Sequence, residues 1–151
     1  MNRNDYKKVA ARMSDKILPN RPPALLVDDY PDVLIGIGAF LEAAGFDVVR
    51  AASGDEALAR LSSGQRFTLL VTDYAMPGLN GVDLTRQALE LFPDLKALII
   101  TGFPSDAGLF DRPSNVALLA KPFRRATLMQ ALRSLFPAGQ LNLPASSGRA
   151  N

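Results

Sequence analysis

The chain has 151 residues, of which 48% are hydrophobic and 21% charged, with a formal net charge of +2. These values are ordinary for a soluble globular protein, and the length allows one domain with a sizeable core. Because the sequence contains no cysteine and no histidine, disulfides, thiolate chemistry and imidazole bases are excluded, and any catalysis has to use carboxylates and a hard, oxygen-bound metal ion.

Residues 1–23 form a basic N-terminal extension, with six Lys or Arg and two Asp within residues 1–22. The segment can form a helix, and we interpret it as frayed or loosely docked; a basic amphipathic helix for a membrane or an acidic partner is the alternative. It has no apolar signal core, and no apolar stretch of the chain approaches about eighteen residues, so we expect a cytoplasmic protein. One side of the extension carries apolar residues at helical spacing, namely Tyr6, Val9, Ala10, Met13 and Ile17.

Short apolar runs then alternate with segments of helical periodicity. Runs of four to six apolar residues are typical of parallel strands that are buried on both faces. In chain order we predict a strand at 24–27, a helix at 31–44, a strand at 46–51, a helix between Ser53 and Gly64 that opens with a capping box to Glu56, a strand at 67–72, a helix from 82 to Pro93, strands at 95–100 and 116–120, and a last helix that ends before Pro137.

This alternation predicts an α/β fold with a flavodoxin-like, doubly wound, five-stranded parallel sheet in the order 2-1-3-4-5 and helices on both faces. We place this domain at residues 24–136. Residues 103–115 contain two prolines and Gly108, so a helix there is expected to be short or irregular. Residues 137–151 have no periodic apolar stripe, and we expect a disordered tail.

Polar residues follow four of the predicted strands. Asp28 and Asp29 follow the first strand, Asp73 the third, Thr101 the fourth and Lys121 the fifth. The carboxyl ends of parallel strands meet at one edge of the sheet, so these side chains should converge there. Three carboxylates, a hydroxyl and an ammonium suit phosphoryl transfer assisted by Mg²⁺.

Four motifs in this order resemble the receiver domain of response regulators, the CheY-like module of two-component signalling. They are VDDYPD, TDYAMPGLNG, ITGF and AKPF, and together they cover the chain from about Ala24 to Phe136. The resemblance implies a single-domain response regulator that takes a phosphoryl group from a sensor histidine kinase or a histidine phosphotransfer protein and then binds a downstream protein. The resemblance further implies a signalling module that catalyses only its own phosphorylation and dephosphorylation, and we expect no direct DNA binding and no membrane insertion.

The resemblance also assigns roles to residues. Asp73 is the phosphoacceptor, Thr101 hydrogen-bonds the phosphoryl group and Lys121 pairs with it. Mg²⁺ is held by Asp28, Asp29, Asp73 and the backbone carbonyl of Ala75. In similar proteins the peptide bond between this lysine and the following proline is cis.

One position departs from the family pattern. The aromatic residue that usually lies three positions before the lysine is replaced by Leu118, so the aromatic rotation described for relatives cannot occur, and another output route is needed. The run GIGAF at residues 36–40 resembles part of a dinucleotide fingerprint, but it falls inside a predicted helix. We interpret its glycines as permitting close helix packing.

Each feature alone has an ordinary explanation: Asp28 and Asp29 as a helix cap, Asp73 as a loop cap, Lys121 as a solvated charge. Two other functions also remain open. The first is a Mg²⁺-dependent phosphohydrolase with an aspartate nucleophile, although DDY replaces the usual DxD and no cap insertion is present. The second is a receiver-like binding module that is never phosphorylated.

Overall fold

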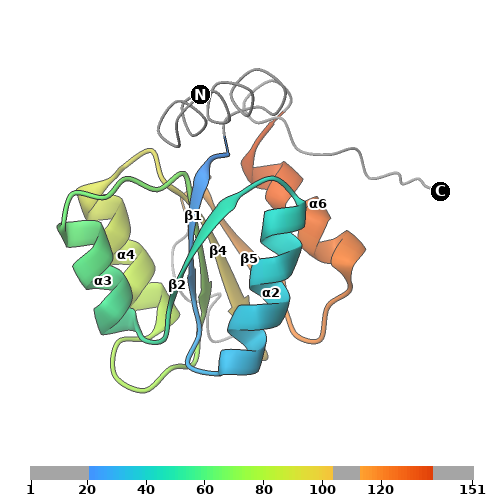
Figure 1. Ribbon diagram of the computed structural model, residues 1–151, viewed down its shortest axis with the longest axis horizontal. Coiled ribbons are helices and arrows are strands. Elements are labelled where there is room, and N and C mark those ends of the chain that lie inside the picture. Colours follow the sequence, from blue (N-terminus) through green and yellow to red (C-terminus); the bar gives the residue numbers. More distant parts are fainter. Residues whose placement is uncertain (1–20, 104–112, 138–151) are drawn as a thin grey trace, which may run out of the picture.

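The computed structural model describes residues 21–103 and 113–137, in which strands and helices alternate along the chain (Figure 1). The elements are β1 (Pro23–Val27), α2 (Pro31–Ala43), β2 (Asp47–Ala51), α3 (Gly54–Ser62), β3 (Leu69–Asp73), α4 (Gly81–Leu91), β4 (Lys96–Thr101), β5 (Val116–Ala120) and α6 (Arg125–Leu135). The predicted strands are all present, with bounds that differ from the observed ones by at most two residues.

The five strands form one parallel sheet in the order β2-β1-β3-β4-β5. This is the predicted flavodoxin-like order. It makes β3 the central strand, with β1 on one side and β4 on the other. All the strand ends that carry predicted site residues therefore lie at one edge, and β3 delivers Asp73 to the middle of that edge.

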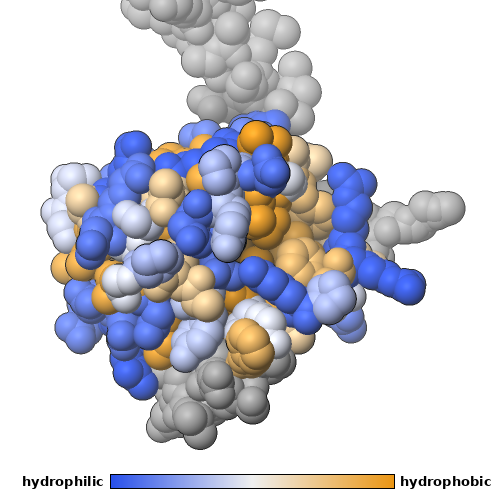
Figure 2. Space-filling model, turned by 90° about the horizontal axis from the view of Figure 1, so that it is seen from below, coloured by the Kyte–Doolittle hydropathy of each residue, from blue (hydrophilic) through white to orange (hydrophobic). Residues whose placement is uncertain are grey.

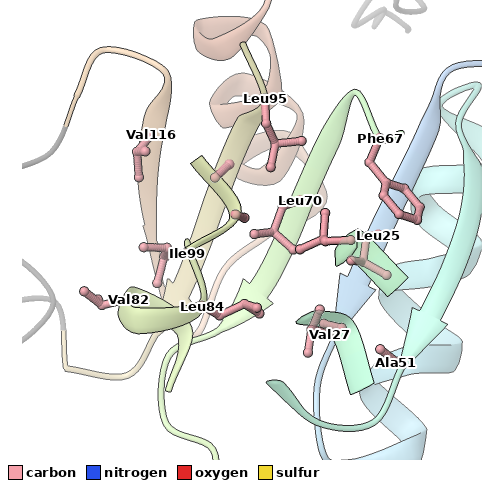
Figure 3. Close-up of a cluster of buried hydrophobic side chains, with 14 of the residues drawn as sticks. Leu25, Val27, Ala51, Phe67, Leu70, Val82, Leu84, Leu95, Ile99 and Val116 are labelled. Carbon is pink, nitrogen blue, oxygen red and sulfur yellow. The ribbon is translucent and has the colours of Figure 1, made fainter. Parts of the chain in front are cut away.

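Helices cover both faces of the sheet: α3 and α4 lie on one face, and α2 and α6 lie on the other (Figure 1). Alternate residues of a strand point to opposite faces. Leu25 and Leu70 thus belong to the cluster under α3 and α4, shown in Figure 3, whereas Leu26 and Val71 belong to the cluster under α2 and α6. These strand side chains are fully buried or nearly so, and burial of each stabilises the fold by roughly 1.5–3 kcal/mol.

Side-chain caps fix the starts of two helices near the site. Ser53 Oγ accepts from the backbone N–H of Glu56 at 3.0 Å, and Glu56 Oε1 accepts from the N–H of Ala52 at 3.0 Å. The predicted capping box is therefore present, although Glu56 reaches Ala52 and not the N-cap residue. At α4, Asn80 Oδ1 accepts from the N–H of Asp83 at 2.9 Å.

The two glycines of α2 differ from the interpretation above. Gly38 lies against the guanidinium of Arg50 in β2, and nothing lies within 4 Å of a Cβ placed at Gly36. Close helix packing is therefore wrong for both positions: Gly38 makes room for an arginine from the neighbouring strand, and Gly36 faces open space.

Three predictions concern residues outside the described ranges. They are the character of the basic extension over residues 1–20, the irregular helix within 104–112 and the disordered tail over 138–151. Among the helices that the structure describes, none has the length and apolar character needed to cross a membrane.

Candidate functional site

The predicted site residues gather at the carboxyl edge of the sheet. Asp73 is the last residue of β3 and pairs with Ile100 of β4, whereas Thr101 pairs with Ala120 at the end of β5. Backbone hydrogen bonds continue this pairing beyond the strands: the N–H of Tyr74 donates to Ile100 O and the N–H of Lys121 donates to Thr101 O, both at 2.8 Å. Asp73, Thr101 and Lys121, which come from three successive strands, are thereby held at the same edge.

Three carboxylates form the centre of the site. One oxygen from each of Asp28, Asp29 and Asp73 lies within 4.8 Å of the other two, and Asp28 and Asp73 are only 3% and 5% exposed. Within the described residues Asp29 Oδ1 is buried and has no hydrogen-bond partner. Buried acids without enough donors are costly unless a cation neutralises them. Oxygen donors in this number suit Mg²⁺, so these residues fit the metal that the resemblance implied.

The environment of Asp28 shows how crowded these charges are. Burial raises the pKa of Asp28 above its ordinary value, and the charges of Asp73 and Asp29 act in the same direction. The N–H of Tyr30, which donates to Asp28 Oδ1 at 2.9 Å, and the charge of Lys121 lower this pKa but do not outweigh burial. The pocket is therefore short of positive charge.

Lys121 supplies the nearest described positive charge to Asp73. Its Nζ lies 2.6 Å from Asp73 Oδ1, and its side chain is 39% exposed while that of Asp73 is buried. The lysine thus reaches the acid from the solvent side. The Lys121–Pro122 peptide bond is cis, as the resemblance implied.

Thr101 is buried beside this pair, at the end of β4. Its Oγ1 accepts from the backbone N–H of Phe103 at 2.9 Å. A hydroxyl that accepts one hydrogen bond can still donate its own hydrogen to an anionic oxygen. Thr101 is therefore suited to hydrogen-bond an anion held at this edge.

Ala75 lies in the loop between β3 and α4. The N–H of Gly81 donates to Tyr74 O at 2.9 Å and closes this loop, and Gly78 has a positive φ of 77° that favours glycine. Ala75 therefore lies in a closed loop, two residues after Asp73.

Two contributors were missed from the sequence. The N–H of Tyr30 caps Asp28 in an Asx turn, and an aspartate three residues before Pro31 is a signal that could have predicted it. Thr72 donates its hydroxyl to Asp73 O at 2.9 Å; no pattern in the sequence distinguishes this threonine from an ordinary strand residue.

Comparisons with known proteins find a matching family model and similar relatives. A family model for the response regulator receiver domain matches residues 24–133. The response regulator receiver protein CpdR of Brucella abortus is 36% identical over 116 residues, which cover 76% of this chain and 96% of CpdR. Sensor kinase CckA of the same organism is 32% identical over 114 residues, and there the match covers 74% of this chain but only 12% of the kinase.

Solved structures agree. A response regulator receiver protein from Sinorhizobium medicae superposes with a TM-score of 0.73 at 29% identity, over 79% of this chain and 97% of that one. The fold, the family model and the similarity to CpdR together show that the chain belongs to the response regulator receiver domain family of two-component signalling.

Proposed function

We propose that this chain is a single-domain response regulator that accepts a phosphoryl group on Asp73 in a Mg²⁺-dependent reaction. The observation that carries the proposal is the buried Asp73 carboxylate, 2.6 Å from the Lys121 ammonium and within 4.8 Å of two further carboxylates. A lone buried acid would be a poor nucleophile toward an anionic donor, because like charges repel.

Each residue then has a separate role. An oxygen of Asp73 bonds to phosphorus while the bond from phosphorus to the donor nitrogen breaks, and the donor imidazole leaves with the electron pair. Lys121 balances the charge of the new phosphoryl group, and the Thr101 hydroxyl donates to one of its oxygens. Mg²⁺, when bound, offsets the repulsion between the carboxylates and the incoming group. Asp28, Asp29, Asp73 and the Ala75 carbonyl would hold it.

The donor is proposed to be a sensor histidine kinase or a histidine phosphotransfer protein. Support comes from the absence of histidine in these 151 residues and from the similarity to part of a protein named sensor kinase CckA. The surface next to the site is also suited to a protein donor. Viewed from the carboxyl edge of the sheet, apolar side chains gather on the side of α2 and α6 (Figure 2), and Val33, Ile37 and Phe123 line a groove there that reaches Lys121.

The proposal also covers the output of the phosphorylated chain and its domain bounds. Phosphorylation switches the surface that a downstream protein recognises, without direct DNA binding and with no reaction beyond self-phosphorylation and dephosphorylation. The receiver occupies residues 24–136, between the basic extension 1–23 and the tail 137–151, and acts in the cytoplasm.

Acetyl phosphate tests the proposal without a partner. Wild type incubated with acetyl phosphate and Mg²⁺ should gain about 80 Da by intact mass spectrometry, the mass of one phosphoryl group. Asp73→Asn should gain nothing, whereas Asp47→Asn, an exposed acid at the opposite edge of the sheet, should be labelled like wild type. Labelling that survives Asp73→Asn, or no labelling of wild type, would contradict the proposal. Steady release of phosphate from a chromogenic ester would instead indicate the phosphohydrolase.

A further inference from the structure

The residue before the acceptor, Thr72, carries a fully buried hydroxyl. Thr72 is 0% exposed and precedes Asp73 in the central strand. It pairs with Val27 of β1 and Ile99 of β4, and both of these belong to the apolar cluster under α3 and α4. A valine would match the shape of Thr72 in such surroundings without introducing a polar atom. The hydroxyl is therefore the feature that calls for a physical explanation.

This hydroxyl forms a hydrogen bond to the backbone of the acceptor residue. Thr72 Oγ1 donates to the carbonyl oxygen of Asp73 at 2.9 Å. Gly81, the first residue of α4, also lies close to that carbonyl: a Cβ there would collide with Asp73 O and crowd the Cα of Tyr74. The carbonyl of Asp73 thus accepts a hydrogen bond from its own strand and lies close to the first residue of the following helix.

This arrangement restrains the peptide unit that links Asp73 to Tyr74. Rotation about the Cα–C bond of Asp73 would displace the loop that carries the Ala75 carbonyl relative to the Asp73 carboxylate. Phosphoryl transfer requires the reacting atoms to be held in a narrow geometry, and small displacements cost rate.

We propose that Thr72 is a positioning residue for phosphoryl transfer, whose hydroxyl fixes the Asp73–Tyr74 peptide unit next to Gly81 and thereby fixes the loop that carries the Ala75 carbonyl relative to the acceptor carboxylate. The inference rests on the proposed function, because it concerns the same carboxylate. Thr72 does not contact the phosphoryl donor. Its effect is on the rate of phosphorylation and on the affinity for Mg²⁺, both of which depend on how the Asp73 carboxylate and the Ala75 carbonyl lie relative to each other.

The test compares isosteric and conservative variants. Thr72→Val keeps the shape and removes the hydrogen bond, and Thr72→Ser keeps the hydroxyl. The matched control is Thr85→Val, because Thr85 is also fully buried and also donates to a backbone carbonyl, that of Gly81 at 2.7 Å, but this bond is the ordinary back-bond of a helix. The readouts are the labelling rate with acetyl phosphate at saturating Mg²⁺, the Mg²⁺ dissociation constant by calorimetry, and the urea midpoint.

Thr72→Val is expected to be labelled about fivefold more slowly and to bind Mg²⁺ about fivefold more weakly, the factor that loss of one ordinary hydrogen bond corresponds to. Thr72→Ser should restore both values, and Thr85→Val should match wild type in both, while the urea midpoint shows that each variant is folded. Equal rates and affinities for Thr72→Val and wild type would overturn the role of Thr72. So would an equal loss in Thr85→Val, or a failure of Thr72→Ser to recover. Wild type that neither becomes labelled nor binds Mg²⁺ would instead contradict the proposed function, and the positioning role with it.

Discussion

Asp28 carries its charge in surroundings that disfavour it. Burial is the largest cause of its raised pKa, and two neighbouring acids add to the effect. A group whose pKa is higher in the folded state than its ordinary value of 3.8 binds its proton more tightly when folded. Stability therefore rises as the pH falls through the raised pKa, and at neutral pH the ionised group lowers the free energy of unfolding.

Asp28→Asn should therefore raise the free energy of unfolding at pH 7 in Mg²⁺-free buffer, because the amide keeps an oxygen for the N–H of Tyr30 and carries no charge. The same variant should gain less stability than wild type when Mg²⁺ is added, since it lacks one of the proposed ligands. Urea unfolding with and without Mg²⁺ measures both effects.

Asp32→Asn is the control for that comparison. Asp32 is an exposed acid in the first turn of α2, so this variant removes the same charge from the same region and leaves the carboxylate cluster intact. It should leave the Mg²⁺ effect unchanged and lower stability slightly through the helix dipole. A lower stability of Asp28→Asn than of wild type in Mg²⁺-free buffer would contradict the view that the cluster is electrostatically strained.

At the level of elements, a side chain of strand β2 determines which residue fits at one position of helix α2. Arg50 of β2 extends across α2, where its Nε donates to Leu34 O at 3.1 Å and its Nη2 pairs with Glu42 at 3.3 Å. The guanidinium occupies the space where a side chain of Gly38 would lie. Gly36, one half-turn earlier, has no such neighbour and weakens the helix for no packing gain.

The two glycines should respond differently to alanine. Gly36→Ala should raise the free energy of unfolding by roughly 0.5–1 kcal/mol, because alanine loses less conformational entropy in a helix. Gly38→Ala should raise the free energy of unfolding by less than Gly36→Ala does, or should lower it. The reason is that the Arg50 guanidinium must move away from Leu34 O and Glu42. Urea unfolding of both variants, and of both in an Arg50→Ala background, measures this. In the Arg50→Ala background the two substitutions should change the free energy of unfolding by the same amount. A persistent difference would show that Arg50 does not cause the different responses.

The same helix marks where prediction from the sequence succeeds and where it ends. Pro31 and Gly45 bracket α2, and the apolar runs give the strands, because both signals are local and repeat with the period of the element. The role of Gly38 depends on Arg50, which belongs to a different element, and nothing local encodes that contact. The hydroxyl of Thr72 escaped notice for a similar reason, because its environment is set by the strands and helices packed around it.

For the whole molecule, the order of the strands converts separate motifs into one site. Asp28, Asp73, Thr101 and Lys121 could be predicted together because each ends a buried parallel strand, and such ends share an edge. Their separations could not be predicted, since these depend on the register between strands and on side-chain conformation. The order also makes the site asymmetric. The acids lie at β1 and β3, whereas Thr101 and Lys121 lie at β4 and β5.

This asymmetry predicts which half of the molecule responds to phosphorylation. A phosphoryl group on Asp73 should draw Thr101 and Lys121 toward it, as a population shift on the side of β4 and β5. Thr101 Oγ1 would then move away from the N–H of Phe103, and the hydrogen bond that this N–H donates to it in the present structure would break. This displacement would need no aromatic residue at Leu118, and it would supply an output route that starts at β4.

Hydrogen exchange followed by mass spectrometry measures the response. In the phosphorylated chain the amide of Phe103 should exchange about fivefold faster, the factor expected for loss of one hydrogen bond. The amide of Asp47, which donates to Pro22 O beyond the opposite end of the sheet, should not change. Asp73→Asn treated with acetyl phosphate and Mg²⁺ should show neither effect, which separates phosphorylation from metal binding. Faster exchange in β2 with none near Phe103 would place the output on the other half of the sheet, because Thr101 Oγ1 is the group that accepts from this amide in the described residues.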